Sequence, residues 1–231
     1  MKLSIVIPVF NEKNTIAEIL KRIEAVDLDV KKEIIIVDDF STDGTRDILE
    51  KLDAGKYKII FQEKNCGKGA ALKKGFLAAT GDIVLIQDAD LEYDPKDYQK
   101  LIGPILTNRA DVVYGSRFLT SEPKRVLYIW HLVGNLFLTG LSDLLTGLTF
   151  SDMETCYKAF RKEVVDSFKH QLKSERFGIE PELTARVARG KWRIYEVGIS
   201  YYGRTYTEGK KINWKDGLAA IWHIIKFNLF K

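Results

Sequence analysis

Five short runs of apolar, often β-branched residues constrain the fold of this chain more than any other feature. The runs occupy residues 3–7, 33–37, 57–61, 82–86 and 111–114, and segments with helical signals separate them. Most of the runs are continuous rather than alternating, which is typical of strands that are covered on both faces. Strands that alternate with helices predict an α/β fold with a mainly parallel sheet and right-handed crossovers.

Helix signals fill the gaps between these runs. The first helix has one apolar face, made by Ile16, Ile19, Leu20 and Ile23. A second helix should follow Gly44, capped by Ser41, Thr42 or Asp43, and a third should end before Gly81. The dipeptide Asp94-Pro95 is typical of a helix start with the aspartate as N-cap.

The second half of the chain has a different pattern. Residues 125–147 should form one or two very apolar helices, and residues 179–189 a helix that stops at Gly190. Residues 192–202 predict one long strand or a strand pair. A C-terminal helix is expected over residues 214–230, with apolar side chains at helical spacing: Leu218, Ile221, Trp222, Ile225 and Leu229. The sequence contains no internal repeat or linker, so we predict a single domain over residues 1–231.

Composition excludes several classes of protein. A chain of 231 residues that is 45% hydrophobic can bury a proper core, and a net charge of +4 does not indicate nucleic-acid binding. Cys66 and Cys156 are too few for a disulfide framework, so a reducing compartment is favoured. The N-terminal apolar run is short and is broken by Pro8, so we expect no signal peptide there. No stretch reaches the about 18 apolar residues of a transmembrane helix.

Carboxylates follow the fourth apolar run at alternate positions. Asp88, Asp90 and Glu92 come where a buried strand should end, at the edge where ligands bind in parallel sheets. Carboxylate oxygens select Mg²⁺ or Mn²⁺ over softer metals, and such a cation can grip a diphosphate. A solvated turn is the alternative. No zinc motif is present.

Other polar residues are expected at the same edge. Asp38 and Asp39 end the second run and are placed to accept hydrogen bonds from a base or ribose, with helix capping as the alternative. The loop 65–69 lets backbone approach an anion and adds Lys68 at a helix N-terminus. Leu72 stands where the third glycine of a dinucleotide fingerprint belongs, which argues against a Rossmann dehydrogenase.

Two arginines and one apolar segment point to a phosphate and a lipid. Arg117 and Arg204 follow predicted strands, and guanidinium forks suit phosphate oxygens, although surface salt bridges are an alternative. Residues 126–150 predict either a core helix or one that lies in a membrane interface or lines a lipid groove. Lysines that could meet anionic head groups, or be solvated surface, are Lys210, Lys211, Lys226 and Lys231.

Taken together, five blocks in this order resemble glycosyltransferase family 2, in its dolichol-phosphate mannose synthase-like branch. The blocks are residues 4–12, 37–45, 65–71, 88–92 and 115–117. The resemblance implies a GT-A fold, with a nucleotide-sugar half over residues 1–117 and an acceptor and membrane-interface half over 118–231. It implies inverting transfer of a hexose to a dolichyl or polyprenyl phosphate, and an interfacial helix pair that fits residues 126–150.

The resemblance also implies roles for individual residues. Positions that bind the nucleotide sugar match Pro8, Phe10, Glu12, Val37, Asp39, Lys68, Asp88 and Ala89. The metal set matches Asp88, Asp90 and Glu92, where some relatives have Gln at the third position. Residues for the acceptor phosphate match Ser116, Arg117 and Arg204, with either Arg125 or His131 as a further basic residue.

The donor and the catalytic acid–base chemistry stay open. Residues 151–158 are somewhat closer to dolichyl-phosphate glucosyltransferases, whereas residues 90–93 favour mannose synthases, so GDP-mannose and UDP-glucose both remain. A phosphate acceptor is largely dianionic at neutral pH and needs no general base. Asp152 is the candidate if one exists, and its alternative is capping or a pair with Lys158 or Arg161.

Competing functions follow from the same residues. The chain could transfer sugar to a polysaccharide or protein sugar, bind nucleotide sugars without catalysis, or activate sugars as a nucleotidyltransferase. The last would need a glycine-rich basic loop after the first strand, and residues 8–11 do not provide one. For the favoured function we expect a location at the cytoplasmic face of a membrane, held peripherally, with a membrane-anchored partner or a second copy as possible companions.

Overall fold

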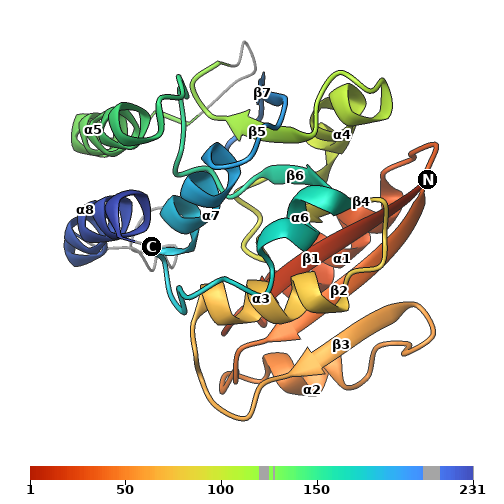
Figure 1. Cartoon of the computed structure of the whole chain (residues 1–231). Coiled ribbons are helices and arrows are strands. Elements are labelled where there is room, and N and C mark those ends of the chain that lie inside the picture. Colours follow the sequence, from red (N-terminus) through yellow and green to blue (C-terminus); the bar gives the residue numbers. More distant parts are fainter. Residues whose placement is uncertain (120–124, 127, 205–213, 231) are drawn as a thin grey trace.

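The computed structural model describes residues 1–119, 125–126, 128–204 and 214–230 (Figure 1). In this part of the chain one seven-stranded sheet has the order β3-β2-β1-β4-β6-β5-β7. Its strands are β1 (Lys2–Val9), β2 (Lys31–Asp38), β3 (Tyr57–Phe61), β4 (Ile83–Ile86), β5 (Val112–Ser116), β6 (Lys158–Arg161) and β7 (Ile194–Gly198). All neighbours are parallel except β6, which runs antiparallel to β4 and β5. The predicted α/β class and the five predicted strands are confirmed.

Helices cover both faces of the sheet, because successive residues of a strand point to opposite sides. Ile5 and Ile7 of β1 pack with the first group of helices, and Val6 packs with the second. The first group comprises α1 (Ile16–Ala25), α2 (Thr45–Leu49), the short 3₁₀ helix η1 (Pro95–Asp97) and α4 (Tyr98–Leu106). The second comprises α3 (Lys68–Ala78), α6 (Lys162–Phe168) and α7 (Ile179–Ala188). The sheet is therefore enclosed, as its continuous apolar strands predict.

Local signals fix several helix starts where the sequence predicts them. Asp94 caps η1, with its side chain accepting a hydrogen bond from the backbone N–H of Lys96, and Pro95 takes the first position. Gly44 precedes α2 with φ of 98°, a conformation that glycine adopts at little steric cost. Among the three predicted caps, Asp43 makes the contact, because its Oδ1 accepts from the Thr45 N–H at 3.0 Å.

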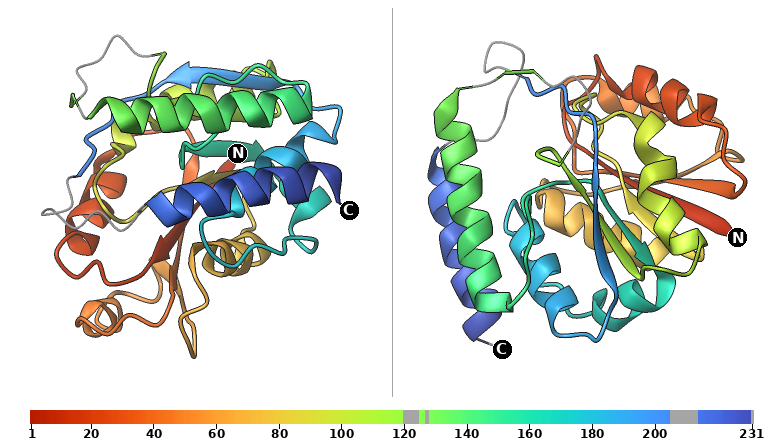
Figure 2. Two further views of the ribbon diagram at one scale, coloured as in Figure 1. Left: turned by 90° about the vertical axis from the view of Figure 1, so that its left-hand side faces the viewer. Right: turned by 90° about the horizontal axis from the view of Figure 1, so that it is seen from above.

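Two further helices, α5 (Ile129–Thr146) and α8 (Trp214–Leu229), lie side by side as an outer layer (Figure 2). The helix pair expected within residues 126–150 is wrong in one respect, since that stretch supplies a single helix and the second member is α8. Neither is long and apolar enough to cross a membrane, nor is any other helix among the described residues.

The buried face of α8 differs from the predicted one. Ala220, Ile224 and Phe227 are buried, whereas the predicted stripe includes three residues that are more than half exposed: Leu218, Trp222 and Leu229. The reason is that α8 is apolar on more than one side, so spacing alone does not select the face that packs on the domain.

Candidate functional site

Carboxylates converge beyond the carboxyl ends of β1 and β4. Glu12 follows β1, and Asp90 and Glu92 follow β4, where Leu91 between them has φ of 64°. That left-handed backbone is uncommon for a leucine. Arg204, which follows β7, reaches all three carboxylates and so connects the segments after β1, β4 and β7 at this edge.

The contacts of Arg204 are short and specific. Its Nη2 lies 3.0 Å from Asp90 Oδ2 and 3.6 Å from Glu12 Oε1, and its Nε lies 3.3 Å from Glu92 Oε1. The backbone N–H of Arg204 donates to the same Glu92 oxygen at 2.9 Å, and the Tyr201 hydroxyl donates to the other at 3.0 Å. Burial raises the pKa of Asp90 to about 7, and the charges of Asp88 and Glu92 add to this rise.

A second cation holds the first carboxylate of the set. Lys68 Nζ lies 2.9 Å from Asp88 Oδ1, 3.0 Å from Glu180 Oε1 and 2.9 Å from Cys156 Sγ. Burial by itself would raise the pKa of Asp88, but the Lys68 charge, hydrogen bonds from Cys156 and Lys68 and the charge of Lys158 together lower it. Glu180, at the start of α7, is a site residue that sequence reasoning missed, because no local motif marks it.

The donor set suits a hard divalent cation in its chemistry. Asp88, Asp90 and Glu92 offer carboxylate oxygens, which are the ligands that Mg²⁺ and Mn²⁺ prefer. Each of these carboxylates forms an ion pair with Lys68 or Arg204. Consistent with that pairing, no group of three acidic, histidine or cysteine side chains is arranged around one metal position in the described ranges.

The Asp39 carboxylate accepts hydrogen bonds from the loop that precedes α3. Its Oδ1 accepts from Gln62 Nε2 at 2.6 Å and from the Cys66 N–H at 2.8 Å, and its Oδ2 accepts from the Gly67 N–H at 2.6 Å. Asp38 is fully buried and pairs with Arg46 at 2.7 Å. Asp39 therefore fixes the 65–67 backbone, and its predicted contact with a base or ribose stays a prediction.

Arg117 forms a bidentate pair with Asp152. Its Nε and Nη2 each lie 2.7 Å from one carboxylate oxygen of Asp152, and its backbone N–H donates to Oδ2 at 3.0 Å. Asp152 is fully buried. The expected alternative partners of Asp152 are wrong, because Lys158 donates to the backbone carbonyl of Met153 and Arg161 pairs with Asp111.

Several predicted residues lie deeper than expected. Val37 is wholly buried in the core and Ala89 nearly so, and their predicted contact with the nucleotide sugar stays a prediction. Ser116 is also fully buried, and its hydroxyl accepts from the Phe118 and Leu119 N–H groups; its predicted contact with an acceptor phosphate stays a prediction. These positions shape the site from beneath.

Other predicted residues lie at the edge itself. Pro8 and Phe10 are half-buried around the end of β1. Arg125 Nη1 donates to the carbonyl of Gly203 at 3.1 Å and so lies beside Arg204, whereas His131 lies in the first turn of α5. Arg125 therefore lies near the carboxylates, and the choice between Arg125 and His131 as the further basic residue stays a prediction. Lys210, Lys211 and Lys231 lie outside the described residues.

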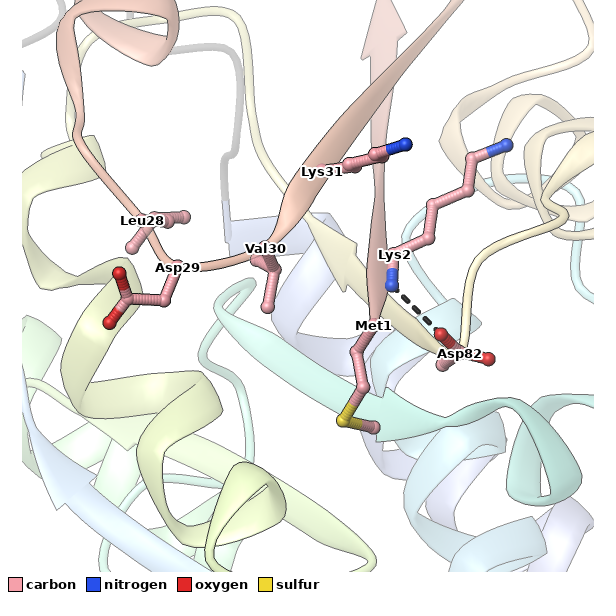
Figure 3. A pocket seen from close by; sticks show the side chains of 7 residues that line it. All are labelled: Met1, Lys2, Leu28, Asp29, Val30, Lys31 and Asp82. Atoms are coloured by element: carbon pink, nitrogen blue, oxygen red, sulfur yellow. Dashed lines mark hydrogen bonds between the residues drawn. The ribbon is translucent and has the colours of Figure 1, made fainter.

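Two cavities lie elsewhere on the molecule. One of about 640 Å³ is lined by Met1, Lys2, Val30 and Asp82, where the Lys2 N–H donates to the Asp82 carboxylate (Figure 3). It lies at the amino ends of β1 and β2, opposite the carboxylates, so its position does not favour catalysis. The other, of about 850 Å³, touches the carboxylate loop through Leu91.

The sequence of this chain is similar to those of two transferases that act on dolichyl phosphate. A dolichol-phosphate mannosyltransferase of Pyrococcus furiosus is 31% identical over 227 residues, covering 92% of this chain and 61% of that protein. A UDP-N-acetylglucosamine–dolichyl-phosphate N-acetylglucosaminyltransferase of Methanococcus voltae is 27% identical over 245 residues, covering 98% of this chain and 96% of that protein.

A solved structure shares the fold. Glucosyl-3-phosphoglycerate synthase from Mycobacterium tuberculosis, crystallised with Mn²⁺, UDP and phosphoglyceric acid, superposes with a TM-score of 0.72 at 23% identity. The match covers 98% of this chain and 76% of that one. The family description "Glycosyl transferase family 2" matches residues 4–168. The chain therefore belongs to glycosyl transferase family 2, and its GT-A-like α/β fold is the one that the sequence predicts.

Proposed function

We propose that this protein transfers a hexose, with inversion, from a nucleotide sugar to a polyprenyl or dolichyl phosphate. The observation that carries the proposal is the convergence of Glu12, Asp90 and Glu92 on Arg204 at the carboxyl edge of the sheet. Acidic residues suit a metal that grips a diphosphate, and an arginine beside them suits a second phosphate. Both polyprenyl-phosphate relatives support this class of acceptor.

A divalent cation, Mg²⁺ or Mn²⁺, is part of the proposal. Asp88, Asp90 and Glu92 would hold it, and when bound it supplies Lewis-acid stabilisation of the leaving nucleoside diphosphate. Lys68 keeps Asp88 ionised and fixed, since it contacts that carboxylate from the N-terminus of α3. The protein thereby prepares an anionic ligand in a buried place, where an unpaired charge would be costly.

Positioning is the main task of the arginines. The acceptor phosphate carries its own charge and needs no deprotonation, so the protein must only hold it near the anomeric carbon against repulsion from the donor diphosphate. Arg125 Nη1 donates to the carbonyl of Gly203, next to Arg204 in the chain, so Arg125 can hold the acceptor phosphate while Arg204 contacts the phosphates of both donor and acceptor. Arg117 is held by Asp152 at 2.7 Å, which gives Asp152 a positioning role in place of the general base considered from sequence.

Lipid would be reached through the outer helix layer. The face formed by α5 and α8 carries large apolar side chains that are more than half exposed: Ile129, Trp130, Val133, Leu136, Phe137, Leu144, Leu218, Trp222 and Leu229. Exposed apolar area on this scale is typical of an interaction surface. We therefore assign to this face peripheral docking on a bilayer, which would bring the polyprenyl phosphate to the carboxyl edge.

GDP-mannose is the favoured donor, with UDP-sugars as the second candidate. The mannosyltransferase relative supports the first. The N-acetylglucosaminyltransferase relative and residues 151–158 support the second. Competition assays with labelled GDP-mannose, UDP-glucose and UDP-N-acetylglucosamine on a short polyprenyl phosphate separate them, because only one donor should give lipid product.

Asp90→Ala tests the site. We expect a loss of transfer of at least about a hundredfold, because a ligand of the charge-stabilising centre is removed. The fold should remain, as judged by circular dichroism and thermal unfolding. Asp166→Ala is the control, since this exposed carboxylate pairs with Lys162 and Lys169 away from the sheet edge. Full activity of the Asp90 variant with added Mn²⁺ would refute the metal assignment.

A further inference from the structure

The Arg204 guanidinium lies where a bound metal ion would otherwise neutralise the carboxylates of this site. Its guanidinium lies within 3.6 Å of carboxylate oxygens from three separate residues, namely Glu12, Asp90 and Glu92. Its side chain is 18% exposed, which is enclosed for an arginine. Burial would lower its pKa, but the surrounding carboxylates raise it. The side chain is thus a charged counter-ion for a buried acidic cluster.

The two cations of the site are held differently. Lys68 belongs to α3 and is fixed by Asp88 and Glu180 at 2.9 and 3.0 Å, with Cys156 beside it. Arg204 belongs to no helix or strand, and it follows the isolated bridge between Tyr93 and Tyr201. Arg204 is thus positioned mainly by the carboxylates that it pairs with, whereas Lys68 is also positioned by α3.

A divalent cation and the Arg204 guanidinium cannot share Asp90. Arg204 Nη2 already lies 3.0 Å from Asp90 Oδ2 and the Glu92 N–H donates to Oδ1 at 3.1 Å, so a metal on Asp90 would come close to the guanidinium, and two positive charges repel strongly in a buried site. A metal that enters without nucleotide must therefore displace the arginine into solvent. When a nucleoside diphosphate enters with the metal, the released guanidinium gains phosphate oxygens as new partners.

From this geometry we infer that Arg204 is an exchangeable counter-ion that couples metal binding to diphosphate binding. It holds the acidic cluster before the substrate arrives, competes with the metal for Asp90, and passes to a phosphate when metal and donor bind together. Because coupling between two ligands is reciprocal, the diphosphate should strengthen metal binding as much as the metal strengthens diphosphate binding. The inference rests on the proposed metal and donor, and it adds that Arg204 of the chain itself competes with the metal for Asp90.

Binding of Mn²⁺ to the full chain, measured by calorimetry and by the electron paramagnetic resonance of free Mn²⁺, tests the exchange without any sugar transfer. In the absence of nucleotide, Arg204→Gln should bind Mn²⁺ about tenfold more tightly than the wild type, because one charged competitor is gone. With saturating GDP or UDP, the wild type should gain more Mn²⁺ affinity than the variant does. Arg193→Gln is the matched control, since it removes an arginine paired with Asp111 elsewhere.

Arg204→Lys keeps the test open should the Gln variant fail to fold. A lysine retains the charge but cannot reach three carboxylates with a fork, so its Mn²⁺ affinity should lie between those of the wild type and the Gln variant. Equal or weaker Mn²⁺ binding in both Arg204 variants, or no binding in any protein, overturns the exchange. Failure of the proposed function would look different. In that case the Mn²⁺ affinities of the wild type and the variants would differ as predicted, but no pair of donor and acceptor would give lipid product.

Discussion

At the scale of single residues, the contacts of Asp152 indicate that it positions Arg117 rather than acting as an acid or base. Its carboxylate is fully buried, and the Arg117 guanidinium and backbone take both oxygens. Removing one partner of a buried pair leaves the other charge uncompensated, at a cost of about 3–5 kcal/mol. We therefore expect Asp152→Ala to lower the free energy of unfolding by that amount and to reduce transfer.

Chemical denaturation followed by fluorescence measures the first effect, and the labelled-sugar assay measures the second. Asp152→Asn should retain more stability than the Ala variant, because the amide oxygen can still accept from Arg117. A variant that loses transfer while its unfolding midpoint stays at the wild-type value would instead indicate a base that acts directly on the acceptor.

The same residue shows what sequence reasoning can and cannot find. The carboxylates at 88, 90 and 92 are recognisable because they follow one apolar run at alternate positions. Their counter-ions are not, since Arg204 lies 114 positions from Asp90 and Glu180 carries no motif. Burial is equally hidden: Val37 and Ser116 belong to matching blocks, yet their side chains point into the protein. Motif position predicts proximity to the site but not contact with a ligand.

At the scale of helices and strands, the predictions hold where apolar runs are long. The parallel strands, α1 and α8 follow from such patterns, and glycines mark the ends of α3 and α7, whereas β6 has four residues, two of which are cations. One of these, Lys158, is fully buried and donates to the carbonyls of Met153 and Thr155. A lysine in a sequence predicts an exposed position, so its burial in the core is not expected from the pattern. Tertiary contacts decide such a short strand, and β6 is therefore missed.

The contact between α7 and α8 depends on Gly178. A Cβ at this position would lie 2.6 Å from the His223 ring, which stacks on Phe227 one turn further along α8. We expect Gly178→Ala to displace α8 and to lower the free energy of unfolding by about 1–3 kcal/mol, the usual cost of overpacking. Proteolysis of the native protein should also cut sooner near α8, because the helix is held less firmly.

Gly140 in α5 is the matched control for this substitution. Nothing lies within 4 Å of its added Cβ, so Gly140→Ala should stabilise the helix by about 0.5–1 kcal/mol through better helical propensity. The two glycines should therefore give opposite signs in thermal unfolding. Equal effects would mean that α8 does not rest on α7 through His223.

At the scale of the whole molecule, α5 and α8 lie together on one side of the domain (Figure 2). Their exposed residues include two tryptophans, Trp130 at 77% and Trp222 at 57%, and tryptophan favours the boundary between water and lipid. Lys226 lies on α8, where a cation can meet anionic head groups. Exposed tryptophans beside a cation support the proposed docking of this face on a bilayer.

Membrane docking predicts how the protein partitions between water and vesicles. Replacing Trp130 and Leu144 together by Ser removes two of the most exposed apolar side chains of the layer, at 77% and 79%. Each is worth about 1.5–3 kcal/mol when fully buried, so co-sedimentation with vesicles of zwitterionic and anionic lipid should weaken at least about tenfold.

Leu77→Ser is the control for this experiment, because Leu77 is 45% exposed on α3, outside the outer layer. Light scattering in the absence of lipid separates the competing explanation, since a face that binds a second copy should give a wild-type dimer and a monomeric double variant. Docking on lipid instead requires a wild-type monomer that binds vesicles and a double variant that does not. If the proposed acceptor is presented by the bilayer, the double variant should also lose transfer to long-chain acceptor in vesicles while keeping transfer to a short, water-soluble polyprenyl phosphate.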